Sequence, residues 1–265
     1  MRWLTVAILC FGCFGIETPT VESARELLKS GRVVEALREI RELQMQAPDD
    51  PNLQFEIGEI LQELAASRAE QLQKLAPKSP QLHELIGKSL ESHQKTTEAE
   101  AEYKLAAREN PLMPGINFLI GNLYFKQRDF AAAKPALEAE LKLNPNHALA
   151  NLRLAQIMLV TDADEPRKCI PYLKKAIADP HTGLEGHREL GKALRLAGKY
   201  SEALDQFELV ARQRPDDEFV HAQLAALYRD QGNTEQARKE MEIQKQILER
   251  EREASLKAHE GQAAR

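Results

Sequence analysis

Small residues recur along this chain at an almost constant interval, and this interval constrains the fold more than any other feature. A period of roughly 20 to 50 residues indicates a repeated supersecondary unit instead of a single globular core. We number each unit from its small residue, which is position 0. The spacings are 34, 29, 34, 34, 36 and 34 residues, and every position 0 is alanine or glycine: Ala24, Gly58, Gly87, Gly121, Ala155, Gly191 and Ala225.

Other positions recur with the same period. Isoleucine or leucine stands at −1 in six of the seven units, and a large apolar residue or tyrosine stands at +3. Because these positions are one helical turn apart, they predict an apolar stripe on a first helix, and the small residue between them lets a second helix approach closely. Neither helix can bury its stripe alone, so the pairs should stack. A proline closes each of the first six units and should end its second helix: Pro48, Pro77, Pro111, Pro145, Pro180 and Pro215.

The composition agrees with a helical protein. The chain of 265 residues is 43% hydrophobic but only 5% aromatic, and the residues that dominate it favour helix. Its net charge is −5, from 36 basic and 41 acidic residues. This balance leaves no basic excess to neutralise a phosphate backbone, so we expect no nucleic-acid partner.

The spacing resembles the tetratricopeptide repeat, a helix-turn-helix unit of about 34 residues. The sixth unit matches the landmarks of that family closely: Gly191, Leu194, Gly198, Tyr200, Ala203, Phe207 and Pro215. The resemblance covers about Thr20 to Gln246 and six to seven repeats. It implies an all-α, right-handed α-solenoid of about seven stacked antiparallel helix pairs. We expect the array over residues 16–246 and a charged helical extension with a disordered tail over 247–265.

Three units depart from the pattern. The second unit has lost most of its turn, so residues 52–76 form either two helices with a tight corner near Ala65 or one long helix. The fifth unit inserts two residues in the acidic turn "TDADEP", and this alignment places Cys169 at the small, core-facing position +12. No proline closes the last unit, so its second helix should continue past residue 246.

The N-terminal stretch "MRWLTVAILCFGCFG" is typical of a secretory signal peptide. Arg2 is followed by an uncharged run from Trp3 to Gly15, shorter than the roughly 20 apolar residues that span a bilayer. We expect residues 1–15 to be removed before Ile16, which leaves Cys169 as the only cysteine. The protein is then exported to the periplasm or the extracellular space.

Lipidation is the alternative for this stretch. Gly12 before Cys13 resembles the lipobox of bacterial lipoproteins, although Cys10 and Phe11 depart from its pattern. If Cys13 carries a lipid, the protein is anchored to a membrane at its N-terminus. The absence of an N-x-S/T acceptor from the sequence favours a bacterial envelope over a eukaryotic secretory route.

The sequence contains no pattern that indicates catalysis. His83, His187 and His221 all lie at −4, where the repeat normally has a large packing residue, so we interpret them as structural. The acidic turn around Asp162 and Asp164 lacks the glycine and the later glutamate of a calcium loop. Nucleotide-binding and hydrolase motifs are absent from the sequence. We therefore expect no enzyme, no metal and no cofactor.

The resemblance implies that the first helices line a concave groove that binds extended peptides or partner helices. In our register the groove side chains fall at −3, +1, +4 and +5. The candidate residues are Phe118, Asn122, Phe125, Lys126, Leu152, Gln156, Leu159, Arg188, Lys192, Arg195 and Arg229. This set is apolar in the middle and basic toward the C-terminus, so it favours a segment with apolar anchors followed by acidic residues. The alternative is that its apolar members only pack beneath neighbouring helices.

Asn122 and Lys126 are similar to part of the clamp with which some family members hold a peptide carboxylate, but the rest of the clamp does not match. The function we expect is a non-catalytic scaffold or adaptor in the cell envelope. The alternatives are a lipid-anchored assembly factor and a regulatory module of an enzyme.

Overall fold

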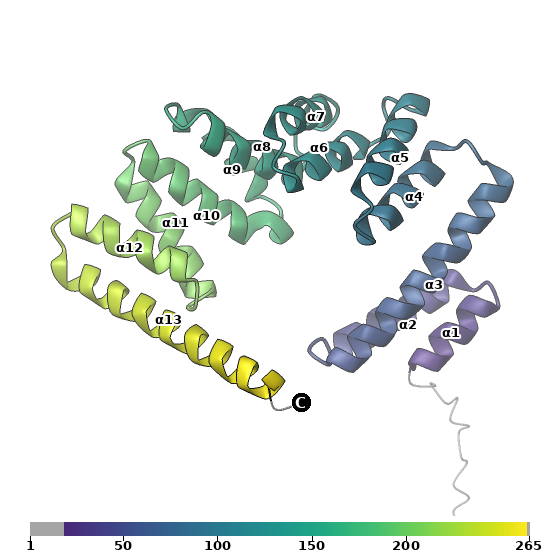
Figure 1. Ribbon diagram of the computed structural model, residues 1–265, viewed down its shortest axis with the longest axis horizontal. Coiled ribbons are helices and arrows are strands. Elements are labelled where there is room, and N and C mark those ends of the chain that lie inside the picture. Colours follow the sequence, from purple (N-terminus) through teal and green to yellow (C-terminus); the bar gives the residue numbers. More distant parts are fainter. Residues whose placement is uncertain (1–18, 264–265) are drawn as a thin grey trace, which may run out of the picture. The chain divides into compact units, whose positions relative to one another are not determined.

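The computed structural model describes residues 19–263, and the chain divides into two compact units between Pro77 and Lys78 (Figure 1). Every regular element within residues 19–263 is helical, as predicted. None of the helices in this range is both long enough and apolar enough to cross a membrane. The predicted signal peptide, its cleavage before Ile16 and the alternative lipid on Cys13 lie outside the described residues.

The first unit contains α1 (Val21–Lys29), α2 (Val33–Gln46) and α3 (Pro51–Leu75). Its core joins all three helices through Ala24, Ile40 and Ile57. Of the two alternatives for the second repeat, the single long helix is correct, because α3 runs for 25 residues without a break. Asp50 caps its N-terminus, and the segment that follows Gly58 contains no glycine or proline to turn the chain.

The second unit consists of five antiparallel helix pairs that follow one another along the chain (Figure 1). Together with α1 and α2 they make six pairs, while α3 takes the place of the seventh pair that we expected. The ten helices are α4 (Pro80–Ser92), α5 (Thr96–Glu109), α6 (Ile116–Lys126), α7 (Phe130–Leu143), α8 (Ala148–Thr161), α9 (Ile170–Ala176), α10 (Pro180–Leu196), α11 (Tyr200–Gln213), α12 (Glu218–Asp230) and α13 (Thr234–Ala263).

The small residues at position 0 lie where the two helices of a pair touch. A Cβ atom added to Gly121 would lie 2.8 Å from Cγ of Leu137, and one added to Gly191 would lie 2.8 Å from Cε1 of Phe207. Both distances are too short for carbon atoms that are not bonded to each other. The predicted reason for the small residue, close approach of the second helix, is therefore confirmed in these units.

The two irregular units at the C-terminal side also match their predictions. The extra residues of the fifth unit form a loop and a short 3-10 turn, η1 (Pro166–Lys168), directly before Cys169. Cys169 is 1% exposed and belongs to the core of the second unit. The last helix, α13, continues past residue 246 to Ala263 without interruption.

Candidate partner-binding surface

The predicted groove residues lie on the first helices α6, α8, α10 and α12, and we call the surface they share the first-helix face. On α6, Phe118 and Phe125 are half-buried against the apolar cluster formed by α7 and α8. The Phe118 ring lies 4.7 Å from the ring of His147. Asn122 is also half-buried, while Lys126 is exposed and donates a 2.7 Å hydrogen bond to Glu91.

Two residues of the predicted set do not lie on the surface. Leu152 is 0% exposed and Leu159 is 5% exposed, and both are buried in the core cluster with Leu173 and Leu190. For these two leucines the packing alternative is correct. The reason is that helix α10 of the next unit covers the side of α8 on which they stand.

Gln156 remains near the surface and belongs to a polar network that includes Arg153, a residue that sequence reasoning missed. Arg153 Nη1 donates to Gln156 Oε1 at 2.7 Å and to Glu185 Oε1 at 3.1 Å, and Gln156 Nε2 donates to the same Glu185 oxygen at 2.8 Å. The Arg153 guanidinium also lies 4.9 Å from the centre of the Phe125 ring. Arg153 stands at −2, outside the positions that the register assigned to the groove.

Three predicted basic residues come from α10. The Arg188 guanidinium lies 4.4 Å from the centre of the Phe219 ring, and its Nε lies 3.8 Å from Oδ2 of Asp217, too far for a hydrogen bond. Lys192 lies 3.9 Å from Glu189. Within the described residues, the Nε atoms of Arg153, Arg188 and Arg195 are buried and have no hydrogen-bond acceptor.

These three arginines, which we call the arginine set, are suited to bind carboxylates. A guanidinium that stacks on an aromatic ring keeps its planar fork of N–H donors in a fixed orientation. Arg229, the last member of the predicted set, is 72% exposed and lies 3.9 Å from Asp230.

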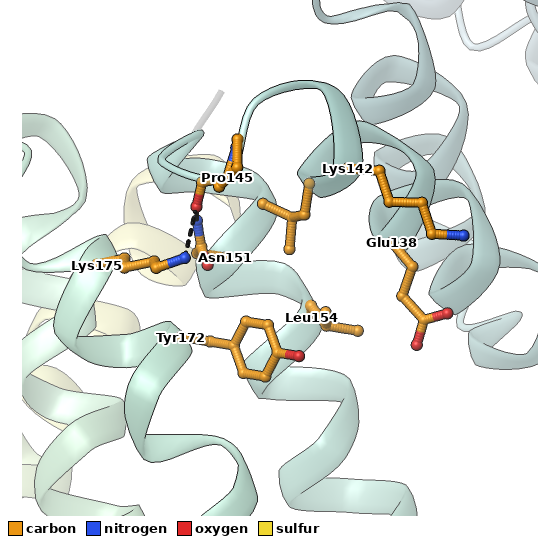
Figure 2. Close-up of a pocket in the computed structure, with 8 residues that line it drawn as sticks. Glu138, Lys142, Pro145, Asn151, Leu154, Tyr172 and Lys175 are labelled. Atoms are coloured by element: carbon orange, nitrogen blue, oxygen red, sulfur yellow. Dashed lines mark hydrogen bonds between the residues drawn. The ribbon is translucent and has the colours of Figure 1, made fainter.

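Position −4 has a role that the sequence analysis did not identify. Gln54 Nε2 donates to the Pro48 carbonyl at 3.3 Å. Asn151 Nδ2 donates to the Pro145 carbonyl at 3.1 Å (Figure 2). Each bond ties a first helix to the proline that closes the preceding unit. A signal for this role was present, because all seven residues at −4 are polar: Thr20, Gln54, His83, Asn117, Asn151, His187 and His221.

The three histidines at −4 also contact the second helix of their own unit. His83 Nδ1 lies 2.7 Å from Glu102 Oε2, and His187 Nδ1 lies 2.7 Å from Gln206 Oε1. These contacts join residues 19 apart in sequence, as does the contact between His221 and Glu240. The histidines are therefore held by hydrogen bonds between helices, which agrees with a structural role.

The second unit also has an open depression of about 350 Å³ between α7, α8 and α9 (Figure 2). Glu138, Lys142 and Tyr172 lie at its rim. Lys175 Nζ donates to the Pro145 carbonyl at 3.0 Å, the same oxygen that Asn151 binds. Because these polar groups hold the turn between α7 and α8, we assign the depression to repeat packing.

Carboxylates in the acidic turn of the fifth unit form ion pairs with lysines. Asp162 Oδ2 lies 3.2 Å from Lys134 Nζ, and Glu165 forms an ion pair with Lys168. Among the side chains that the structure describes, those of residues 19–257, no three of histidine, cysteine, aspartate or glutamate gather closely enough to hold a metal ion.

The chain was compared with known protein families and curated sequences. A tetratricopeptide-repeat family model matches residues 63–114 and 118–165. The BBSome complex member BBS4 homolog from Drosophila melanogaster is 28% identical over 146 residues, which are 52% of this chain and 29% of that protein. The chain thus spans less than a third of the length of this relative.

Solved structures with a similar fold were also found. YrrB, described as a tetratricopeptide-repeat protein with an unusual peptide-binding site, has a TM-score of 0.60 at 20% identity, over 68% of this chain and 91% of YrrB. MamA from Desulfovibrio magneticus RS-1 has a TM-score of 0.57 at 19% identity, over 66% of this chain and 96% of MamA. PilW, a type IV pilus biogenesis factor, has a TM-score of 0.53 at 17% identity, over 64% of this chain and 78% of PilW. These likenesses concern the fold alone, and they confirm the predicted all-α, right-handed α-solenoid.

Proposed function

We propose that this chain, which matches a tetratricopeptide-repeat family model over residues 63–114 and 118–165 and has the fold of such proteins, is a non-catalytic scaffold that binds a segment of a partner protein on its first-helix face. Stacked helix pairs of this kind present extended surfaces to other proteins. The observation that carries the proposal is the arginine set, whose three guanidinium groups lie on the adjacent first helices α8 and α10, two of them over the rings of Phe125 and Phe219.

The partner segment that fits this face has apolar anchors and carboxylates. Phe118 and Phe125 are half-buried on α6 and would supply the apolar part of the contact. The charged part of the face is on α10, which carries Arg188 and Arg195. The Arg188 side chain is 39% exposed. Hydrogen bonds to charged groups contribute about 1.5–3 kcal/mol each, so these arginines would favour aspartate or glutamate in the segment.

We further propose that the protein is exported and acts in the cell envelope. The charge-free run after Arg2 supports a signal peptide, and PilW, a protein of similar fold, is a type IV pilus biogenesis factor. The alternative is a membrane anchor through a lipid on Cys13. Mass spectrometry of the mature N-terminus separates the two, because a chain that begins at Ile16 supports release, while a lipid on Cys13 supports anchoring.

Fluorescence anisotropy with labelled peptides tests the binding proposal. The peptides carry leucine or phenylalanine followed by three glutamates, and the double variant Arg188→Glu with Arg195→Glu is compared with the wild-type chain. The matched control is Lys142→Glu with Lys174→Glu, which changes the net charge equally but lies on the second helices. We expect at least a tenfold loss of affinity in the arginine variant, about 1.4 kcal/mol, and no comparable loss in the control. Equal affinity in both variants would refute the proposed site.

A further inference from the structure

Helix α13 exposes a residue whose counterparts are buried elsewhere in the repeat. Met241 stands at position +16 of the seventh unit and is 59% exposed. Its counterparts in the other helix pairs, with the two inserted residues of the fifth unit allowed for, are all buried: Ile40, Tyr103, Leu137, Leu173 and Phe207. Phe207 contacts Gly191 on its own first helix, and its ring centre lies 6.4 Å from that of Phe219 on the next first helix. Among the described residues no first helix follows α13, so Met241 lacks this second cover.

Two further apolar side chains continue the exposed surface toward the C-terminal end of α13. Leu248 is 46% exposed and Leu256 is 54% exposed. They follow Met241 at intervals of seven and eight residues, about two helical turns each, so the three side chains form a row along one side of the helix. We call Met241, Leu248 and Leu256 the outer row. Figure 1 shows that α12 is the helix of the second unit that lies along α13. Because the end of a repeat array normally has a polar outer face, the outer row indicates a surface that another molecule covers.

The charged residues beside the outer row alternate in sign. They follow one another at steps of four and three residues, which keep them on one side of the helix: Arg238, Glu242, Lys245, Glu249 and Arg252. All five are exposed. In the described part of the chain, the one ion pair among them joins Lys245 to Glu249 at 3.8 Å, which is too long for a hydrogen bond. These charges are therefore available to a second helix that carries the opposite order.

A second copy of α13 that runs in the opposite direction has this order. When a two-fold axis passes close to Ile247, residues at equal distances from Ile247 lie at the same height on the two helices. Lys245 and Glu249 are each two residues from Ile247, so Lys245 of one copy faces Glu249 of the other. Glu242 and Arg252 are each five residues away and face each other in the same way. Each contact occurs twice because the axis is two-fold.

The same arrangement brings the apolar residues together. Leu248 of each copy lies next to the axis, and Met241 lies within one helical turn of Leu256 of the second copy. Other arrangements oppose like charges. A parallel pair in register places each charge beside itself, and an antiparallel pair with its axis close to Lys245 places Glu242 against Glu249. The charge pattern thus favours one direction and one register.

We propose that two copies of this chain form a two-fold dimer through α13, in which each copy covers the outer row of the other. Both copies use the same surface, as in the commonest kind of homo-oligomer. A contact between one helix of each copy is small compared with the roughly 1,200–2,000 Å² of stable interfaces, so the dimer should dissociate on dilution. The dimer does not use the first-helix face, and its test is therefore independent of the proposed partner site.

Sedimentation velocity of the full chain measures this association. We expect the wild-type chain to be dimeric at high concentration and monomeric on dilution, with less dimer at high salt because exposed charges are screened. The acidic variant Lys245→Glu with Arg252→Glu and the basic variant Glu242→Lys with Glu249→Lys bring like charges together. Each should be monomeric where the wild-type chain is dimeric. An equal mixture of the two variants should form dimers again, because their surfaces have opposite charge.

The matched control is Lys239→Glu with Arg250→Glu, which makes the same change of charge as the acidic variant. These two residues stand on the side of α13 away from the outer row, so the control should dimerise like the wild-type chain. A wild-type chain that is monomeric at every concentration would overturn the proposal and would indicate that a helix of another protein covers the outer row. Dimers of the acidic variant alone, or a mixture that stays monomeric, would overturn the charge pairing.

Photocrosslinking between copies tests the direction of the two helices. A benzophenone amino acid replaces Met241, and the variant is mixed with ¹⁵N-labelled wild-type chains so that crosslinks between copies are recognised by mass. We expect a crosslink to the tryptic peptide 253–257 of the labelled copy, which contains Leu256. A crosslink to the labelled peptide 240–245 instead, or none between copies, would contradict the antiparallel pairing.

Discussion

At the scale of single residues, the turn between the helices of a pair requires a left-handed backbone at position +7. Glycine meets this requirement at Gly31, Gly198 and Gly232, with φ of 79°, 76° and 77°. Two other units adopt the same conformation with Gln94 and Arg128, at φ of 60° and 62°. A left-handed conformation costs a residue with a side chain about 1–2 kcal/mol, so these two turns are strained.

We therefore expect Gln94→Gly to stabilise the second unit by about 1 kcal/mol, because glycine adopts this conformation without the steric cost. Chemical denaturation followed by circular dichroism measures the change. The reciprocal variant Gly198→Ala should lose a similar amount. If Gln94→Gly leaves the midpoint unchanged or lowers it, the backbone at this turn is not strained.

Cys169 provides a second prediction for a single residue. Burial raises the pKa of its thiol to about 11. The thiolate is the reactive form, so the folded protein should resist alkylation at pH 8, while the unfolded chain should react readily. Labelling with iodoacetamide, followed by mass spectrometry of the Cys169 peptide, measures the two rates. Rapid labelling of the native protein would show that the fifth unit does not bury this position.

At the scale of helices, α3 distinguishes the second repeat from the others. Its position 0, Gly58, has no atom within 4 Å of an added Cβ, since no second helix folds back onto it. Gly121 has the same register, but its added Cβ would lie 3.1 Å from the backbone nitrogen of Leu137. Two glycines that look equivalent in the sequence therefore have opposite environments.

Alanine substitution should separate these two glycines. Gly58→Ala should stabilise the first unit by about 0.5–1 kcal/mol, because alanine favours helix and meets no neighbour. Gly121→Ala should destabilise the second unit by about 1–3 kcal/mol through overpacking against Leu137. Thermal or chemical unfolding measures both changes. A loss of stability in Gly58→Ala would mean that α3 folds back into a helix pair in solution.

The helices also show what the sequence could and could not predict. The spacing of small residues and prolines predicted the five pairs of the second unit, because those positions report contacts within a pair. It did not decide between one helix and two over residues 52–76, since helix-favouring residues without a turn signal are compatible with both. The burial of Leu152 and the surface position of Arg153 depend on α10 of the next unit, and a register along one helix does not contain that information.

At the scale of the whole molecule, the second unit should fold without the first. All the buried residues in its three core clusters lie between Ala99 and Leu227, within the unit itself. A fragment that begins at Lys78 should therefore be helical and should unfold cooperatively. Circular dichroism measures the helix content and the unfolding of this fragment. Hydrogen exchange then compares its protected amides with those of the same region in the full chain. A fragment without protected amides would show that residues 19–77 are needed for folding.

The central claim concerns the whole second unit, namely that a partner segment binds on the first-helix face. Photocrosslinking locates the bound segment directly. A benzophenone amino acid replaces Lys192 on α10 in one full-length variant and Lys174 on α9, a second helix, in the other. With the labelled acidic peptide we predict crosslinks from position 192, weakened at high salt because surface charges are screened, and none above background from position 174. Equal crosslinking from both positions, or crosslinking from position 174 alone, would contradict the account.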